Sequence, residues 1–106
     1  MLSALPAQAN EVRVKNTGDA PIYNLYIWPS DLIPSSNSVI TFPIGVGDTE
    51  KVKIDNSWSD CVFTFQIDRN DPTDLDRFGY IKLPMNIVEY DICKSDRKPL
   101  PLPQAD

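Results

Sequence analysis

The stretch that most constrains the fold is residues 61–68, which read Cys-Val-Phe-Thr-Phe-Gln-Ile-Asp. Counted in steps of two, this stretch has one apolar face and one mixed face. The apolar face consists of Cys61, Phe63, Phe65 and Ile67. This alternation is the period of a β-strand that buries one side. We therefore expect a strand here, with one of the chain's two cysteines on its buried face.

Short apolar alternations recur along the chain and are separated by residues that favour turns, mainly proline, glycine, asparagine and aspartate. Such spacing predicts an all-β fold, namely an antiparallel β-sandwich of immunoglobulin-like size with six or seven strands, with a small barrel as the alternative. A hairpin between residues 50–55 and 61–68 is the expected pairing. One turn of helix is expected at residues 71–74. The other expected strands are residues 11–15, 22–28, 39–42, 77–83 and 87–93.

At 106 residues the chain has the length of one domain with a modest core. We assign residues 10–98 to the β-sandwich domain. Residues 1–9 end in Ala7-Gln8-Ala9, which fits the small-x-small pattern before a signal-peptidase cut. They are read as the remnant of a leader, or as a disordered tail. Residues 99–106 are read as an extended proline-rich tail.

The two cysteines, Cys61 and Cys93, are expected to form a disulfide. A bridge that closes a loop of about 30 residues stabilises a small domain by roughly 3.5–4 kcal/mol through loop-closure entropy. Two buried free thiols in a cytosolic protein are the alternative. Together with the leader-like start, the expected bridge predicts a periplasmic or secreted location.

Composition argues against most kinds of chemistry. The chain has no histidine, which is the commonest general base and the commonest transition-metal ligand. A net charge of −5 argues against nucleic acid as a partner, and no stretch is long and apolar enough to span a membrane. We expect no enzyme activity, no catalytic residue and no cofactor.

The acidic loop that begins at Asp68 has two possible roles. Asp71, Asp74 and Asp76 offer oxygen ligands of the kind that calcium prefers, although the spacing does not match an EF-hand. A solvated acidic turn that pairs with its own arginines is the alternative to this weak metal site. The same loop, from Asp68 to Asp76, is expected to insert as a plug if the protein is an inhibitor that covers a basic cleft.

Aromatic and leucine side chains are the candidates for binding a protein partner. Trp28 ends an expected strand, and Trp58 lies in a polar turn where we expect it to be half exposed. Leu100 and Leu102 alternate with the prolines of residues 99–103. These leucines lie either on an edge segment that packs on the body or on a stiff tail.

From Val14 to Cys93 the chain resembles a family of small exported bacterial proteins without an assigned activity. The family pattern is roughly N-x-T-G-x-x-I-x-x-L-Y-V-S-P-S, followed by a Gly turn, a Cys strand and a second Cys. The residues that carry the resemblance are Asn16-Thr17-Gly18, Ile22, Leu25-Tyr26-Ile27, Pro29-Ser30, Gly47-Asp48, Val52, Ile54, Cys61-Val62-Phe63 and Cys93. The resemblance implies an exported β-rich domain with a disulfide, and it transfers no catalytic residue.

These features predict a non-enzymatic periplasmic or secreted protein that binds another protein, as an accessory subunit of a complex. The first alternative is a stoichiometric inhibitor or immunity protein that acts through the acidic loop. The second alternative is a calcium- or carbohydrate-binding module.

Overall fold

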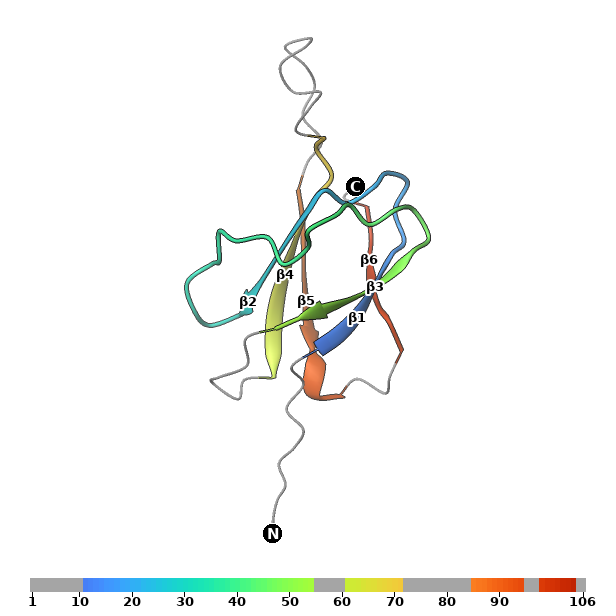
Figure 1. Ribbon diagram of the computed structural model, residues 1–106. Helices are drawn as coiled ribbons and strands as arrows, with labels where there is room; N and C mark the ends of the chain where they lie inside the picture. Colours follow the sequence, from blue (N-terminus) through green and yellow to red (C-terminus); the bar gives the residue numbers. More distant parts are fainter. Residues whose placement is uncertain (1–10, 55–60, 72–84, 95–97, 105–106) are drawn as a thin grey trace.

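The computed structural model describes residues 11–54, 61–71, 85–94 and 98–104. Within these residues the chain forms six strands and one 3-10 turn, and no α-helix (Figure 1). No helix in the described residues is long and apolar enough to cross a membrane. The elements in chain order are β1 (Glu11–Asn16), β2 (Asn24–Pro29), β3 (Thr49–Lys53), β4 (Val62–Asp68), β5 (Asn86–Asp91), the 3-10 turn η1 (Ile92–Lys94) and β6 (Leu100–Leu102).

The described strands form two separate three-stranded sheets, in the orders β3-β1-β6 and β2-β4-β5. β1 pairs with β3, β2 with β4 and β4 with β5, all antiparallel. β6 instead runs parallel to β1. The all-β prediction is therefore confirmed, but the arrangement is not antiparallel throughout. The two sheets do not close into a barrel in the part of the chain that the structure describes.

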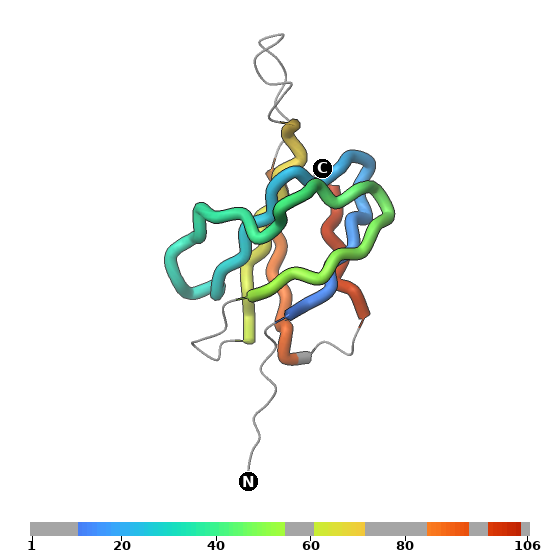
Figure 2. The backbone as a smooth tube through the Cα atoms, viewed as in Figure 1, coloured from blue at the N-terminus to red at the C-terminus, as the bar shows by residue number. Residues whose placement is uncertain are grey.

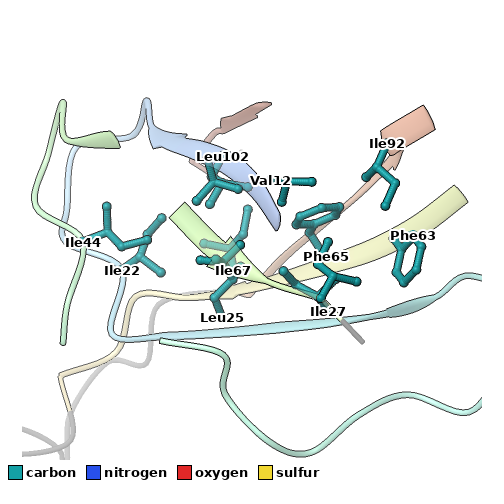
Figure 3. Packing of buried hydrophobic residues seen from close by; sticks show 13 residues of the cluster. Val12, Ile22, Leu25, Ile27, Ile44, Phe63, Phe65, Ile67, Ile92 and Leu102 are labelled. Carbon is teal, nitrogen blue, oxygen red and sulfur yellow. The ribbon is translucent and has the colours of Figure 1, made fainter. Parts of the chain in front are cut away.

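Both sheets contribute to one hydrophobic core. Val14 and Leu102 come from the first sheet and are fully buried, as are Leu25, Phe65 and Ile67 from the second. Figure 3 shows Leu102 of the first sheet and Leu25, Phe65 and Ile67 of the second directed into the same core. The core cluster consists of Val12, Val14, Ile22, Leu25, Ile27, Ile44, Val52, Ile54, Phe63, Phe65, Ile67, Ile92 and Leu102.

β4 is the central strand of its sheet and buries the face predicted from the sequence. Phe63, Phe65 and Ile67 are at most 1% exposed, whereas Val62 on the opposite face is 43% exposed. The ring of Phe65 also meets Tyr90 of β5 edge-on, with ring centroids 5.6 Å apart. Aromatic pairs in this arrangement add about 0.5–1.5 kcal/mol beyond area burial.

The predicted hairpin between residues 50–55 and 61–68 is wrong. β3 pairs with β1, so that Val52 lies opposite Val12, and β4 pairs with β2 and β5 in the other sheet. The physical reason is that alternation fixes which face a strand buries but leaves its neighbour undetermined. The two apolar faces meet across the core instead of lying side by side in one sheet.

Other expected elements differ in detail. Residues 39–42 do not form a strand. Instead, the N–H of Val39 makes one bond to the carbonyl of Leu25, and Ile44 forms an isolated bridge with Ile22. The last expected strand ends at Asp91, where η1 takes over. The expected strand at residues 77–83 and the helix start at residues 72–74 lie outside the described residues.

The disulfide between Cys61 and Cys93 is present, with an S–S distance of 2.02 Å and Cα atoms 5.2 Å apart. Beside it, the backbone N–H of Ile92 donates to the carbonyl of Cys61 at 2.8 Å. The bridge therefore ties the start of β4 to the turn that follows β5. This pairing confirms the bridge expected from the sequence.

Candidate functional site

The connection between β2 and β3, residues 30–48, is long and contains no regular strand. It crosses the molecule from the side of β2 to the side of β3 (Figure 2). Several hydrogen bonds hold it to the neighbouring strands. The hydroxyl of Ser38 accepts a bond from the N–H of Leu25, and the backbones of Ile44 and Ile22 bond each other in both directions. Long connections without secondary structure are uncommon in compact domains and often carry function. We refer to residues 30–48 as the crossover segment.

The crossover segment exposes much of the apolar surface of the described residues. Seven large hydrophobic side chains are exposed among the described residues. Four of them belong to the crossover segment: Leu32, Ile33, Phe42 and Val46. Ile33 is 87% exposed, the most of all seven. Single exposed hydrophobic residues are ordinary, so the contiguous ones are of interest. Leu32 and Ile33 are adjacent in the chain and line the same cavity.

A cavity of about 440 Å³ lies where the first part of the crossover segment meets the ends of β2 and β4. Among the described residues that line it none is ionisable, and the polar side-chain groups are the hydroxyl of Ser35 and the indole N–H of Trp28. The volume lies in the range of about 300–1,000 Å³ that is typical of ligand pockets. The described part of this wall is suited to an apolar group. The lining residues are Ile27, Trp28, Pro29, Leu32, Ile33, Ser35, Ile54 and Phe63.

The predicted partner-binding residues lie in different places. Trp28 lines the cavity, but its side chain is only 8% exposed. Leu102 is fully buried in the core and Leu100 is half-buried, both within β6, so the structure shows the edge segment and not the stiff tail. Trp58 lies outside the described residues. The structure therefore places Trp28 at the cavity and the two leucines elsewhere.

Leu32 and Ile33 were not predicted as binding residues. Two adjacent aliphatic residues followed by Pro34 inside a polar loop were the available signal. The cavity itself could not be predicted, because its wall also takes Ile54 and Phe63 from distant parts of the chain.

The acidic loop is only partly described. The side-chain oxygen of Asp68 accepts both the backbone N–H and the side-chain amide of Asn70, each at 3.0 Å, and both residues are buried. This Asx turn holds the end of β4 and makes Asp68 a structural residue. Asp71 is half-buried and already has an interaction partner. Asp74 and Asp76 lie outside the described residues, so the calcium site stays a prediction.

One group of potential metal ligands is found in the described part of the chain. The ligand atoms of Cys61, Asp91 and Cys93 lie within 4.8 Å of one another. Metals bind the thiolate form of cysteine, and both sulfurs are joined in the disulfide. The carboxylate of Asp91 also accepts the backbone N–H of Cys93 at 3.0 Å. In this oxidised state the group does not form a metal centre.

A buried polar cluster joins the two sheets away from the cavity. Asn16 at the end of β1 is fully buried, and Arg69, just after β4, is 3% exposed. The guanidinium donates through Nη1 to Asn16 Oδ1 at 2.8 Å and through Nη2 to the carbonyl of Leu102 at 2.8 Å. It also donates to the carbonyl of Ala20. Burial lowers the pKa of Arg69, and the nearby charge of Asp19 opposes that shift.

Comparisons of the chain with family models, with curated proteins and with solved structures found no match. The resemblance to small exported bacterial proteins therefore stays a prediction.

Proposed function

We propose that this protein is a non-enzymatic, exported binding protein that acts as an accessory subunit of a protein complex. Its site is the cavity beneath the crossover segment, and the group it takes is an apolar side chain of a protein partner. The observation that carries the proposal is the largely apolar lining that the described residues give the cavity, with the exposed side chain of Ile33 at its border.

A protein partner fits this site because the wall offers little to orient a small ligand. Small-molecule pockets usually combine apolar walls with a few convergent polar groups. Here the described lining residues offer only the hydroxyl of Ser35 and the indole N–H of Trp28. A protein partner gains orientation from contacts outside the pocket, and its buried apolar anchor supplies much of the affinity.

Two further features support an exported protein of this kind. A disulfide is compatible with an oxidising compartment, and it supplies stability that a small core does not provide alone. The two sheets packed on one core are compatible with a β-sandwich of immunoglobulin-like size, which we include in the proposal. Such folds often bind other proteins through their connecting loops.

The proposal is tested by comparing two exposed isoleucines as bait variants. Ile33 borders the cavity, whereas Ile87 lies on β5 and is 59% exposed. The wild-type chain, Ile33→Asp and Ile87→Asp are each used to purify partners from the native envelope. Full burial of an isoleucine contributes about 1.5–3 kcal/mol, so Ile33→Asp should weaken the partner's binding by roughly 10- to 100-fold.

The expected result is one partner recovered with the wild-type chain and with Ile87→Asp, and lost with Ile33→Asp. Equal recovery with both variants contradicts the assignment of the site. A failure of every bait to retain a partner contradicts the accessory-subunit role. Circular dichroism of the three chains confirms that each bait is folded.

A further inference from the structure

β6 is held differently from the other strands. It is the one parallel strand among those described, and its register places Val14 opposite Leu100 and Asn16 opposite Leu102. The carbonyl of Leu102 accepts the backbone N–H of Thr17 at 3.2 Å and the guanidinium of Arg69 at 2.8 Å. The edge of β6 that faces β1 is therefore bonded by both backbone and side-chain donors.

The opposite edge of β6 is bonded by side chains of the other sheet. Backbone groups of successive strand residues point to opposite edges, so Pro101 and Pro103 face away from β1. The carbonyl of Pro101 accepts the hydroxyl of Tyr90, and the carbonyl of Pro103 accepts the amide of Asn86 at 3.1 Å. Proline has no N–H, so this edge carries no unpaired donor at these positions. The alternating prolines therefore suit a neighbouring surface whose side chains, Tyr90 and Asn86, act as hydrogen-bond donors.

The contacts of this segment continue past the end of β6, as far as Gln104. The side-chain oxygen of Gln104 accepts the backbone N–H of Asp19 at 2.7 Å. Gly18 makes room for this contact, because a Cβ there would lie 2.5 Å from the Gln104 oxygen and 2.6 Å from Nη2 of Arg69. Leu102 fills the core from the same segment and is fully buried. Together these contacts are specific for an extended segment that has apolar side chains at alternate positions.

We propose that the space between β1 and β5 is a peptide-binding groove, and that β6 of a second copy of this chain can occupy it. The groove is lined by the donors of Tyr90, Asn86 and Arg69, and its ligand is the segment of residues 98–104. A second copy is the occupant because it carries the segment that the groove demonstrably fits. Exchange of an identical element between copies is a low-cost route to a dimer.

The test first makes the groove vacant in a full-length chain. Leu102→Asp places a charge where a fully buried leucine lies, so we expect this variant to release its own strand and keep the groove. A synthetic peptide of residues 98–104 is then added, and the same peptide with Leu102→Asp is the control. At a peptide concentration of about 100 times Kd, the melting temperature should rise by roughly 10 °C or more. The control peptide should leave it unchanged.

A second experiment tests whether residues 98–104 of one full-length chain can bind in the groove of another. Asn86→Ala combined with Tyr90→Phe removes the donors for the outer edge and leaves β6 intact. Mixed with the Leu102→Asp chain, this double variant should form a one-to-one complex by light scattering after size exclusion. Each variant alone should stay monomeric.

If the Leu102→Asp chain does not fold alone, its refolding with each peptide is followed by circular dichroism, and the wild-type peptide should restore the native spectrum while the control peptide should not. A Leu102→Asp chain that gains neither melting temperature nor native spectrum from the wild-type peptide overturns the groove. Peptide binding without a complex of the two full-length chains overturns exchange between copies.

Discussion

Replacing Asn16 by alanine should destabilise the fold far more than the loss of an ordinary asparagine. The side chain is fully buried and takes part in four hydrogen bonds. Its amide donates to the carbonyls of Ala20 and Ile44, both at 2.9 Å. Its oxygen accepts the N–H of Gly18 at 3.0 Å and the guanidinium of Arg69 at 2.8 Å.

The size of the loss follows from which partners keep another bond. The carbonyl of Ile44 still accepts the N–H of Ile22, and Arg69 still donates to Ala20. The N–H of Gly18 is left without the bond that Asn16 gave it. Neutral hydrogen bonds contribute about 1 kcal/mol each, bonds to charged groups about 1.5–3, and a buried orphan costs about 1–3. The orphaned N–H of Gly18 and the lost bond to the charged guanidinium together give an expected loss of about 2.5–6 kcal/mol in the free energy of unfolding.

Urea unfolding with the disulfide intact measures this loss, and the m-value should stay unchanged. The matched control is Asn37→Ala in the crossover segment, where the side chain is exposed and the change should stay within about 0.5 kcal/mol. A difference below about 1 kcal/mol between the two variants would refute the role of Asn16 in joining the sheets.

Three further predictions follow from other contacts. Replacing Cys61 and Cys93 by alanine should remove roughly 3.5–4 kcal/mol from the free energy of unfolding, because the bridge closes a loop across a sequence separation of 32; equal urea midpoints before and after the change contradict this. Gly18→Ala should cost about 1–3 kcal/mol by crowding the buried guanidinium, whereas Gly45→Ala, whose Cβ would meet only the exposed side chain of Asp48, should be close to neutral in thermal melts. Burial raises the pKa of Tyr90, so the folded chain keeps that proton after the unfolded chain has lost it; stability should fall as pH rises from about 10 towards the folded pKa. Tyr90→Phe should flatten that fall in urea midpoints measured from pH 8 to 11, and an unchanged slope contradicts the burial of the hydroxyl.

The sequence predicted those parts of the fold that depend on local periodicity. The buried face of β4 follows from the alternation of Phe63, Phe65 and Ile67, and their burial agrees. The strand expected at residues 22–28 is present as β2, which ends at Pro29, a residue without an N–H for the ladder. The disulfide followed from two cysteines on short apolar stretches and from the leader-like start of the chain.

What the sequence did not predict depends on contacts between distant residues. Asn16 is typical of a turn by its residue type, but the structure buries it because Ile44 and Arg69 come to meet its amide. Strand neighbours could not be read from alternation, so β3 was paired with the wrong strand. The cavity depends on the same long-range arrangement, since Ile54 and Phe63 complete its wall.

The central claim is that the cavity beneath the crossover segment receives a group from a protein partner. ¹⁹F NMR of Trp28 tests it most directly, because Trp28 lines the cavity and the chain has two tryptophans. In a Trp58→Phe chain labelled with 5-fluorotryptophan, the single resonance reports on this wall alone. Adding the partner recovered with the wild-type bait should shift the resonance and saturate at one equivalent. A complex that forms at the same affinity without moving the Trp28 resonance would contradict the account.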